Sequence, residues 1–211
     1  MNLVFDFGAV LFNWKPAELL AQTFAQEAST PQAAAAMAHA LFAHADWHSF
    51  DRGTLAMDDV VQRSAARLGL DLARVEALMH HIGGHLAPIP GTVALLRELH
   101  ARRVGGADLK LYYLSNMPAP YARRLQELHD FLQCFDGGVF SGDVHWIKPE
   151  PQIYQLLQSR YALEPAQTVF IDDLKHNVHA AEQQGWSGIH FHSPEQLEQE
   201  LVARNIYEKR L

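Results

Sequence analysis

The sequence contains a single cysteine among its 211 residues, Cys134. One thiol excludes an intramolecular disulfide, a pattern typical of reducing compartments, and a lone cysteine is more often a small core residue than a reactive thiol. Basic residues are also scarce, because 17 Lys and Arg stand against 24 Asp and Glu, for a net charge of -7. No basic stripe exists for nucleic acid to bind, so we expect no nucleic-acid partner.

Long hydrophobic runs are missing as well. No stretch approaches the roughly 20 apolar residues of a membrane-spanning helix. The first six residues lack both the basic region and the long apolar run of a signal peptide. We therefore expect a cytoplasmic protein without a membrane partner. Hydrophobic residues make up 48% of the chain and charged residues 19%, a balance that can fill a sizeable core.

Short apolar runs alternate with helical patterns over most of the chain. Such alternation predicts an α/β fold, a three-layer Rossmann-like core with a parallel sheet. The expected strands are 3–5, 109–114, 138–140, 168–171 and 188–191, and the expected helices are 92–103, 121–131, 151–160, 175–184 and one that starts at 194.

One long segment breaks this alternation. Residues 15–88 are rich in Ala and Leu and contain no convincing strand. Helices are expected there over 34–47, 57–67 and 71–81. We predict a helical cap over 15–88, inserted after the first strand of a core formed by 1–14 and 89–211.

Polar residues collect where the expected strands end. Asp6 follows the first strand, Ser115 and Asn116 end the second, and Asp172 and Asp173 end the fourth. Ligands bind outside the carboxyl ends of parallel strands, although the same residue types also favour ordinary turns. Carboxylates that converge at such an edge repel one another without a cation. Oxygen ligands of high charge suit Mg²⁺, so we predict a magnesium site.

Four ordered motifs resemble those of the haloacid dehalogenase (HAD) superfamily of hydrolases. They are residues 5–11 (FDFGAVL), 114–116 (LSN), 148–150 (KPE) and 170–173 (FIDD), and the resemblance covers nearly the whole chain. It implies an α/β core with a small helical cap. The Asp-x-Gly pattern of the first motif is similar to that of sugar phosphatases of the α-glucose-1-phosphate type.

The resemblance also implies roles for the residues that bind phosphate. Asp6 would attack phosphorus and carry the covalent phosphoryl group. Ser115 and Asn116 would hold the phosphoryl oxygens, and Lys148 would neutralise the charge that Asp6 and the phosphate share.

A second set of roles concerns the metal. Asp6, Asp173 and the backbone carbonyl of Gly8 would bind Mg²⁺ directly, and Asp172 would bind it through water or orient it. Asn177 lies four residues after Asp173, on the same side of the expected helix. It is either a supporting residue of the site or a surface amide.

Gly8 is the one departure from the usual phosphatase pattern of the family. A second Asp stands at that position elsewhere and protonates the leaving alcohol. Loss of a general acid costs about 10²–10⁴ in rate. The loss matters least for a good leaving group, such as the anomeric oxygen of a sugar 1-phosphate.

A polar segment of the expected cap resembles the substrate-specificity loop of such caps. Trp47 could stack on a sugar ring, His48 could donate a proton, and Arg52 could bind an anionic group. The alternative is a helix end with a solvated polar face, which we favour for Asp46 and Asp51.

These patterns predict a magnesium-dependent phosphatase that hydrolyses small phosphate monoesters, with sugar phosphates as a candidate class, through an aspartyl-phosphate intermediate. Its partner would be a small phosphorylated metabolite, and its oligomeric state stays open. The alternatives are a metal-independent 2-haloacid dehalogenase, a phosphomutase, and a binding or regulatory protein that retains the fold without turnover. The pair Asp172 and Asp173 argues against the first, and Gly8 keeps the last one open.

Overall fold

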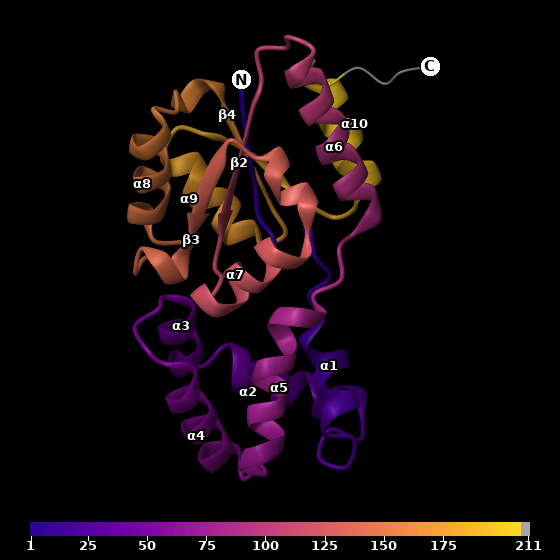
Figure 1. Cartoon of the computed structure of the whole chain (residues 1–211), viewed down its shortest axis with the longest axis vertical. Helices are drawn as coiled ribbons and strands as arrows, with labels where there is room; N and C mark the ends of the chain where they lie inside the picture. The colour runs from indigo at the N-terminus through magenta and orange to yellow at the C-terminus, as the bar shows by residue number, and fades with distance from the viewer. Residues whose placement is uncertain (208–211) are drawn as a thin grey trace.

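The fold is built on a five-stranded parallel sheet. A computed structural model describes residues 1–207. The strand order is β3-β2-β1-β4-β5, and every neighbouring pair is parallel. This arrangement confirms the α/β core with a parallel sheet (Figure 1). The strands are β1 (Asn2–Phe5), β2 (Lys110–Ser115), β3 (Gly137–Phe140), β4 (Thr168–Asp172) and β5 (Ser187–His190).

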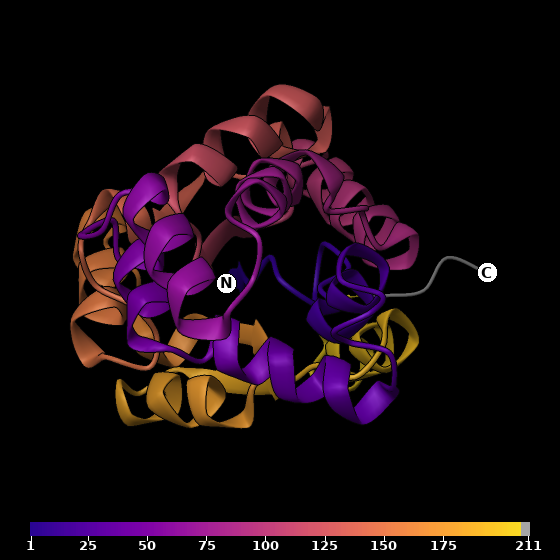
Figure 2. The same cartoon turned by 90° about the horizontal axis from the view of Figure 1, so that it is seen from below.

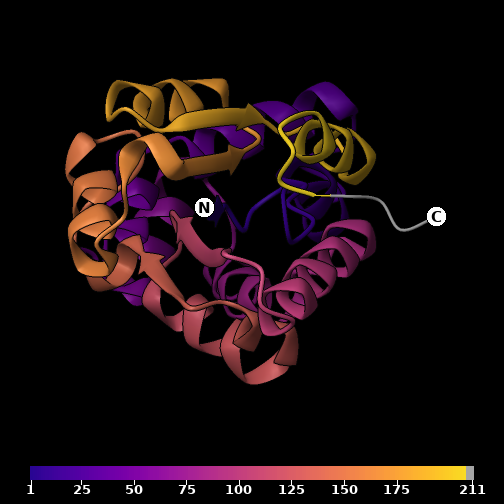
Figure 3. The ribbon, with the colours of Figure 1, turned by 90° about the horizontal axis from the view of Figure 1, so that it is seen from above.

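Helices cover both faces of this sheet, so the core has three layers (Figure 3). Successive strand residues point to opposite faces: in β1, Leu3 and Phe5 belong to one hydrophobic cluster and Val4 to the other. The first cluster packs the sheet against α6 (Pro90–Val104), α7 (Ala119–Leu128) and α10 (Pro194–Ala203), and the second packs it against α8 (Pro151–Tyr161) and α9 (Lys175–Gln183).

A group of helices lies between β1 and α6, and we call it the cap. Figure 1 shows the cap below the sheet, and Figure 2 looks onto it from that side. Among the described residues, no helix is long and apolar enough to cross a membrane. The cap helices are α1 (Pro16–Thr23), α2 (Pro31–Phe42), α3 (Ala45–Asp51), α4 (Met57–Leu68) and α5 (Leu72–His85), and short 3-10 turns elsewhere are η1 (Asp130–Cys134), η2 (Ser141–Asp143) and η3 (Pro165–Gln167).

The single helix expected over 34–47 is wrong in its extent. The chain forms two helices there, α2 and α3, which are separated at Ala43 and His44. The His44 ring accepts a hydrogen bond at Nδ1 from the backbone N–H of Asp46, over 3.1 Å. A side chain that caps backbone N–H groups in this way starts a new helix. The helix that starts there, α3, ends at Asp51, next to the core.

Candidate active site

Three carboxylates meet at the carboxyl end of the sheet. Asp6 follows β1, and Asp172 ends the neighbouring strand β4, with Asp173 directly after it. One oxygen from each carboxylate lies within 4.8 Å of the others. Asp6 and Asp172 are buried and Asp173 is half-buried. Carboxylates this close repel one another unless a cation or a proton compensates them.

Lys148 supplies a positive charge inside this group. Its Nζ lies 2.8 Å from Asp6 Oδ1 and 2.6 Å from Asp172 Oδ2. The Lys148 side chain is buried, so these ion pairs are weakly screened by solvent. Burial alone would lower the pKa of Lys148, but the charges of Asp172 and Asp6 raise it instead. Lys148 therefore stays protonated at neutral pH.

Burial acts more strongly on the carboxylates than Lys148 does. It raises the pKa of Asp6 to about 7, although Lys148 pulls that pKa down, and the charges of Asp172 and Asp173 raise it further. Burial and the charge of Asp172 also raise the pKa of Asp173. Holding negative charge on these carboxylates therefore costs free energy. Such perturbed groups are typical of functional sites.

The amide of Asn116 fixes the backbone around Lys148. Asn116 Oδ1 accepts a hydrogen bond from the Lys148 N–H over 2.7 Å, and its Nδ2 donates to the Lys148 carbonyl over 3.0 Å. This side chain therefore positions Lys148 in addition to lining the site. Ser115, at the end of β2, is buried and lines a cavity together with Asp6 and Asn116.

Asn177 is part of the site and not a surface amide. It is 2% exposed, and its Nδ2 donates to both oxygens of Asp172, over 3.0 and 3.2 Å. The backbone N–H of Leu174 donates to the same carboxylate over 2.8 Å. Asn177 Oδ1 is buried and has no hydrogen-bond partner among the described residues. Asp172 is therefore oriented from three directions, by Lys148, Leu174 and Asn177.

A cavity of about 740 Å³ opens above these residues and extends into the cap. Asp6, Gly8, Lys148 and Asp173 lie among its core residues, and Trp47 and His48 among its cap residues. Much of the cap side is apolar. The apolar side chains in the wall are Trp14, Pro16, Ala38, Phe42, Ala43, Trp47, Ile82, Leu86, Met117, Pro118, Tyr121, Ile147, Pro149 and Leu174.

Arg52 is not one of the lining residues. Its guanidinium forms a two-pronged ion pair with Glu150, at 2.8 and 2.5 Å, and also donates to the His145 carbonyl over 3.0 Å. Arg52 thus joins the cap to the loop that carries Lys148. The predicted binding of an anionic substrate group by Arg52 has no support from this arrangement.

Asp51 contradicts the expectation of a solvated helix end. Its relative exposure is 9%, and it lines the same cavity as Asp6. Burial raises the pKa of Asp51 to about 8, although the Trp47 side chain and the charge of Lys148 act to lower it. Sequence reasoning missed this residue, because position 51 precedes Arg52 and Gly53 in a stretch that looks like an exposed turn. Only the folding of α3 onto the core reveals its burial.

A model of haloacid dehalogenase-like hydrolases matches residues 3–185, most of the chain. The chain belongs to the haloacid dehalogenase-like hydrolase family. It is therefore an enzyme of a hydrolase family, as the four motifs predicted.

Two curated relatives of this HAD-like hydrolase are phosphatases. A sesquiterpene phosphatase of Aspergillus oryzae is 29% identical over 187 residues, which cover 89% of this chain and 87% of the relative. A phosphoglycolate phosphatase of Salmonella typhi is 30% identical over 96 residues, which cover 46% of this chain but only 36% of the relative.

Solved structures of HAD enzymes share the fold of this hydrolase. A HAD family enzyme of Bacteroides thetaiotaomicron is 19% identical with a TM-score of 0.72, over 95% of this chain and 97% of that one. The same enzyme has been solved with magnesium and inorganic phosphate, with a TM-score of 0.68. The L-2-haloacid dehalogenase of Xanthobacter autotrophicus is 22% identical with a TM-score of 0.64, over 98% and 84% of the two chains.

Asp51→Asn is expected to stabilise this hydrolase at neutral and alkaline pH. The folded-state pKa of Asp51, about 8, lies above its ordinary value of 3.8, so folding favours the protonated form. The contribution of the neutral, buried Asp51 carboxyl to folding stability is fully present below about pH 4. It is lost as the pH rises through about 8. Asn has nearly the same shape as Asp and does not titrate. We expect a gain on the order of 3 kcal/mol at about pH 8.5 and little gain at about pH 4.

Thermal unfolding of Asp51→Asn and wild type at both pH values tests this expectation. Asp46→Asn is the matched control, because Asp46 lies in the same helix but pairs with Arg63 and does not line the cavity. A gain in melting temperature that is equal at both pH values would contradict the prediction.

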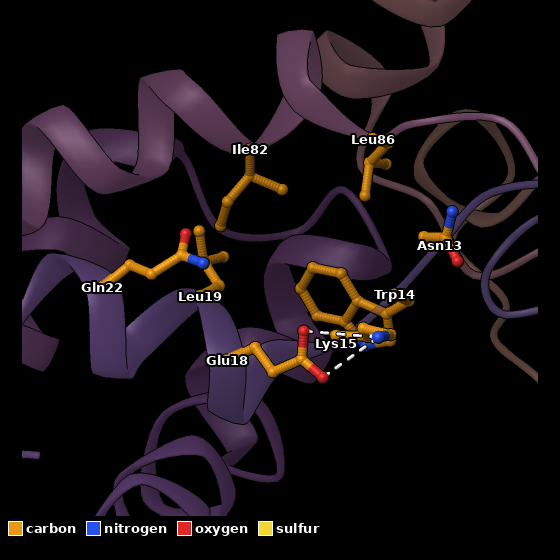
Figure 4. A pocket seen from close by; sticks show the side chains of 8 residues that line it. All are labelled: Asn13, Trp14, Lys15, Glu18, Leu19, Gln22, Ile82 and Leu86. Carbon is orange, nitrogen blue, oxygen red and sulfur yellow. Dashed lines mark hydrogen bonds and ion pairs between the residues drawn. The ribbon is translucent and has the colours of Figure 1, made fainter.

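A second, smaller cavity of about 160 Å³ adjoins the first in the cap (Figure 4). Trp14, Ile82 and Leu86 line both cavities. The outer side of the small cavity is polar, and Lys15 and Glu18 form an ion pair there over 3.0 Å. These three shared side chains are therefore the partition between the large cavity and the surface of the cap.

Proposed function

We propose that this protein is a magnesium-dependent phosphatase that cleaves phosphate monoesters through an aspartyl-phosphate on Asp6. The observation that carries the proposal is the largely buried group of Asp6, Lys148, Asp172 and Asp173 at the core end of a large cavity. A carboxylate that lies 2.8 Å from a buried ammonium group is held in one orientation, which a nucleophile requires.

The donor set fits a hard divalent cation. Asp6 and Asp173 would hold Mg²⁺ directly with the Gly8 carbonyl, and Asp172 would orient it or bind it through water. Two observations support this fit: three carboxylate oxygens lie within 4.8 Å of one another, and Asn177 Oδ1 is buried without a partner among residues 1–207. When bound, the ion neutralises charge on the phosphoryl group and lowers the pKa of the carboxylates beside it.

The residues of the chain divide the remaining work. Asp6 attacks phosphorus as a carboxylate, and Lys148 balances the negative charge that builds up between Asp6 and the phosphoryl oxygens. Ser115 and Asn116 line the cavity next to this point and would donate hydrogen bonds to those oxygens. Water then releases inorganic phosphate and frees Asp6 for the next turnover.

The organic part of the substrate is apolar in this proposal, and not a sugar. A buried sugar needs a hydrogen-bond partner for each hydroxyl group, and the cap side of the cavity offers mainly aromatic and aliphatic side chains such as Phe42, Trp47 and Leu86. A cavity of about 740 Å³ is large enough for a hydrocarbon group of terpenoid size. The similarity to a sesquiterpene phosphatase supports the same substrate class.

Release of inorganic phosphate from a panel of esters tests the proposal. The panel contains p-nitrophenyl phosphate, farnesyl monophosphate, glucose 1-phosphate and glucose 6-phosphate, each with Mg²⁺ and with EDTA. We expect turnover that needs Mg²⁺ and a kcat/KM for the farnesyl ester at least about tenfold above that for either sugar. No turnover of the aryl ester with Mg²⁺ would favour a non-catalytic binding protein. A preference for a sugar ester would refute the apolar substrate class.

A further inference from the structure

The proposed reaction leaves one chemical requirement unmet, and the following inference rests on that proposed function. The alcohol part of an alkyl phosphate leaves as an alkoxide unless an acid protonates the ester oxygen. Gly8 cannot donate that proton. The backbone has room for a side chain there, because a Cβ built on Gly8 would meet only Trp14, at 3.9 Å. The absence of an acid at position 8 is thus not forced by crowding.

Few groups in the cavity can take over this task. Asp6 and Asp173 belong to the carboxylate group that holds negative charge. Tyr121 already donates its hydroxyl proton to the Met79 carbonyl over 2.7 Å, and burial raises its pKa. The lining residues His39, His48 and His176 are exposed, so water reaches their rings. Asp51 is the remaining acid in the wall formed by the described residues.

Asp51 is held rigidly at the edge where the cap meets the core. Its backbone carbonyl accepts a hydrogen bond from Ser141 Oγ over 2.5 Å, and Ser141 Oγ in turn accepts from the Met117 N–H over 2.8 Å. The next residues fix the same edge, because Arg52 pairs with Glu150 and a Cβ on Gly53 would lie 2.3 Å from the Gly142 carbonyl oxygen. The position of Asp51 relative to the core is therefore set by its own backbone carbonyl and by the two residues that follow it, Arg52 and Gly53.

Asp51 lines the same cavity as Asp6 and Lys148, so its carboxyl group shares one ligand-sized space with the reacting groups. Lys148 and Asp6 both act on it electrostatically, yet it belongs to neither the carboxylate group nor an ion pair among residues 1–207. Asp51 thus contributes to the cavity wall from the cap helix α3, the side on which the organic group of the substrate would lie.

We propose that Asp51 is the general acid of this enzyme and replaces from the cap the proton donor that position 8 lacks. In the first step Asp6 Oδ bonds to phosphorus, the bond between phosphorus and the ester oxygen breaks, and the Asp51 proton moves to that oxygen, giving a neutral alcohol. In the second step water attacks the aspartyl-phosphate, its proton moves to the Asp51 carboxylate, and inorganic phosphate leaves. Each turnover returns Asp6 as a carboxylate and Asp51 as an acid.

The burial of Asp51 is consistent with this role, since its raised pKa keeps a proton on the carboxyl group near neutral pH, where a general acid works best. A solvated carboxyl with an ordinary pKa would be ionised and would donate nothing.

The test is the dependence of kcat/KM on the leaving group, measured for wild type and Asp51→Asn with Mg²⁺. The esters are p-nitrophenyl phosphate, phenyl phosphate and n-octyl phosphate, whose alcohols are increasingly poor leaving groups. We expect Asp51→Asn to lower kcat/KM for the octyl ester by about 10²–10³-fold and for the p-nitrophenyl ester by less than about tenfold. Adding Gly8→Asp to Asp51→Asn should recover at least about tenfold on the octyl ester.

Other outcomes overturn the proposal in distinguishable ways. An equal loss on all three esters would make Asp51 a positioning residue, and no loss would remove it from the chemistry. If His48→Gln gives the loss that depends on the leaving group and Asp51→Asn does not, the donor is His48. Asp46→Asn controls for removal of a carboxyl group from α3 and should leave all three values unchanged. A wild type that cleaves none of the esters refutes the phosphatase function itself, and the role of Asp51 with it.

Discussion

Replacing Asp6 with Asn is expected to lower kcat by at least about 10⁴-fold on every ester. Asn has nearly the same shape as Asp, but its amide cannot attack phosphorus or carry the phosphoryl group. Lys148 keeps its 2.6 Å contact with Asp172 in the variant, so the surrounding loop retains its main anchor. The loss should therefore arise from chemistry and not from unfolding.

Phosphate release and mass spectrometry of the acid-quenched enzyme check this result together. Wild type should gain the mass of one phosphoryl group during turnover, and Asp6→Asn should not. Asp143→Asn is a matched control, because Asp143 is exposed in the short turn η2. Phosphorylation of Asp6→Asn at the wild-type rate would show that another residue is the nucleophile.

Replacing Lys148 with Met is expected to have the largest effect on stability. Lys148 is 4% exposed and compensates two buried carboxylates, Asp6 and Asp172. Removing one partner of a buried ion pair leaves charge without compensation and costs about 3–5 kcal/mol. The pKa of Asp6, already about 7, loses the contribution that lowers it. Asp6 would be largely protonated at neutral pH, so we also expect kcat/KM to fall by at least about 10³-fold.

Two further measurements separate the electrostatic cause from poor packing. Mg²⁺ should raise the melting temperature of Lys148→Met more than that of wild type, because the ion would supply the missing positive charge. The double variant Lys148→Met with Asp172→Asn should recover part of the lost stability, since it removes one of the two unpaired carboxylates. If neither change restores stability, loss of side-chain packing would explain the effect instead.

The sheet and the place of the site follow from the sequence because their signals are local. The apolar runs that precede Asp6, Ser115 and Asp172 are short and end in polar residues, so each run predicts both a buried strand and a functional end. Parallel pairing then brings these ends to one edge. The roles of the individual residues at that edge remain predictions for the experiments above.

The cap could be predicted only in outline, because its details depend on contacts between distant segments. The pattern of Ala residues from 34 to 47 continues through a helix boundary that only the His44 ring reveals. Arg52 looks like a binding residue until Glu150, 98 positions later in the chain, comes beside it. Asp51 looks solvated until Ser141, 90 positions later, fixes its carbonyl.

The aromatic lining of the cavity also makes intrinsic tryptophan fluorescence a probe of ligand binding. Trp14 and Trp47 stack with ring centroids 6.4 Å apart, and both line the large cavity. Of the other two tryptophans, Trp186 is buried on the far side of the sheet and Trp146 is 41% exposed. A ligand that fills the cavity therefore changes the surroundings of two of the four indoles. Quenching or a spectral shift of their emission reports occupancy directly, even for a compound that the enzyme never turns over.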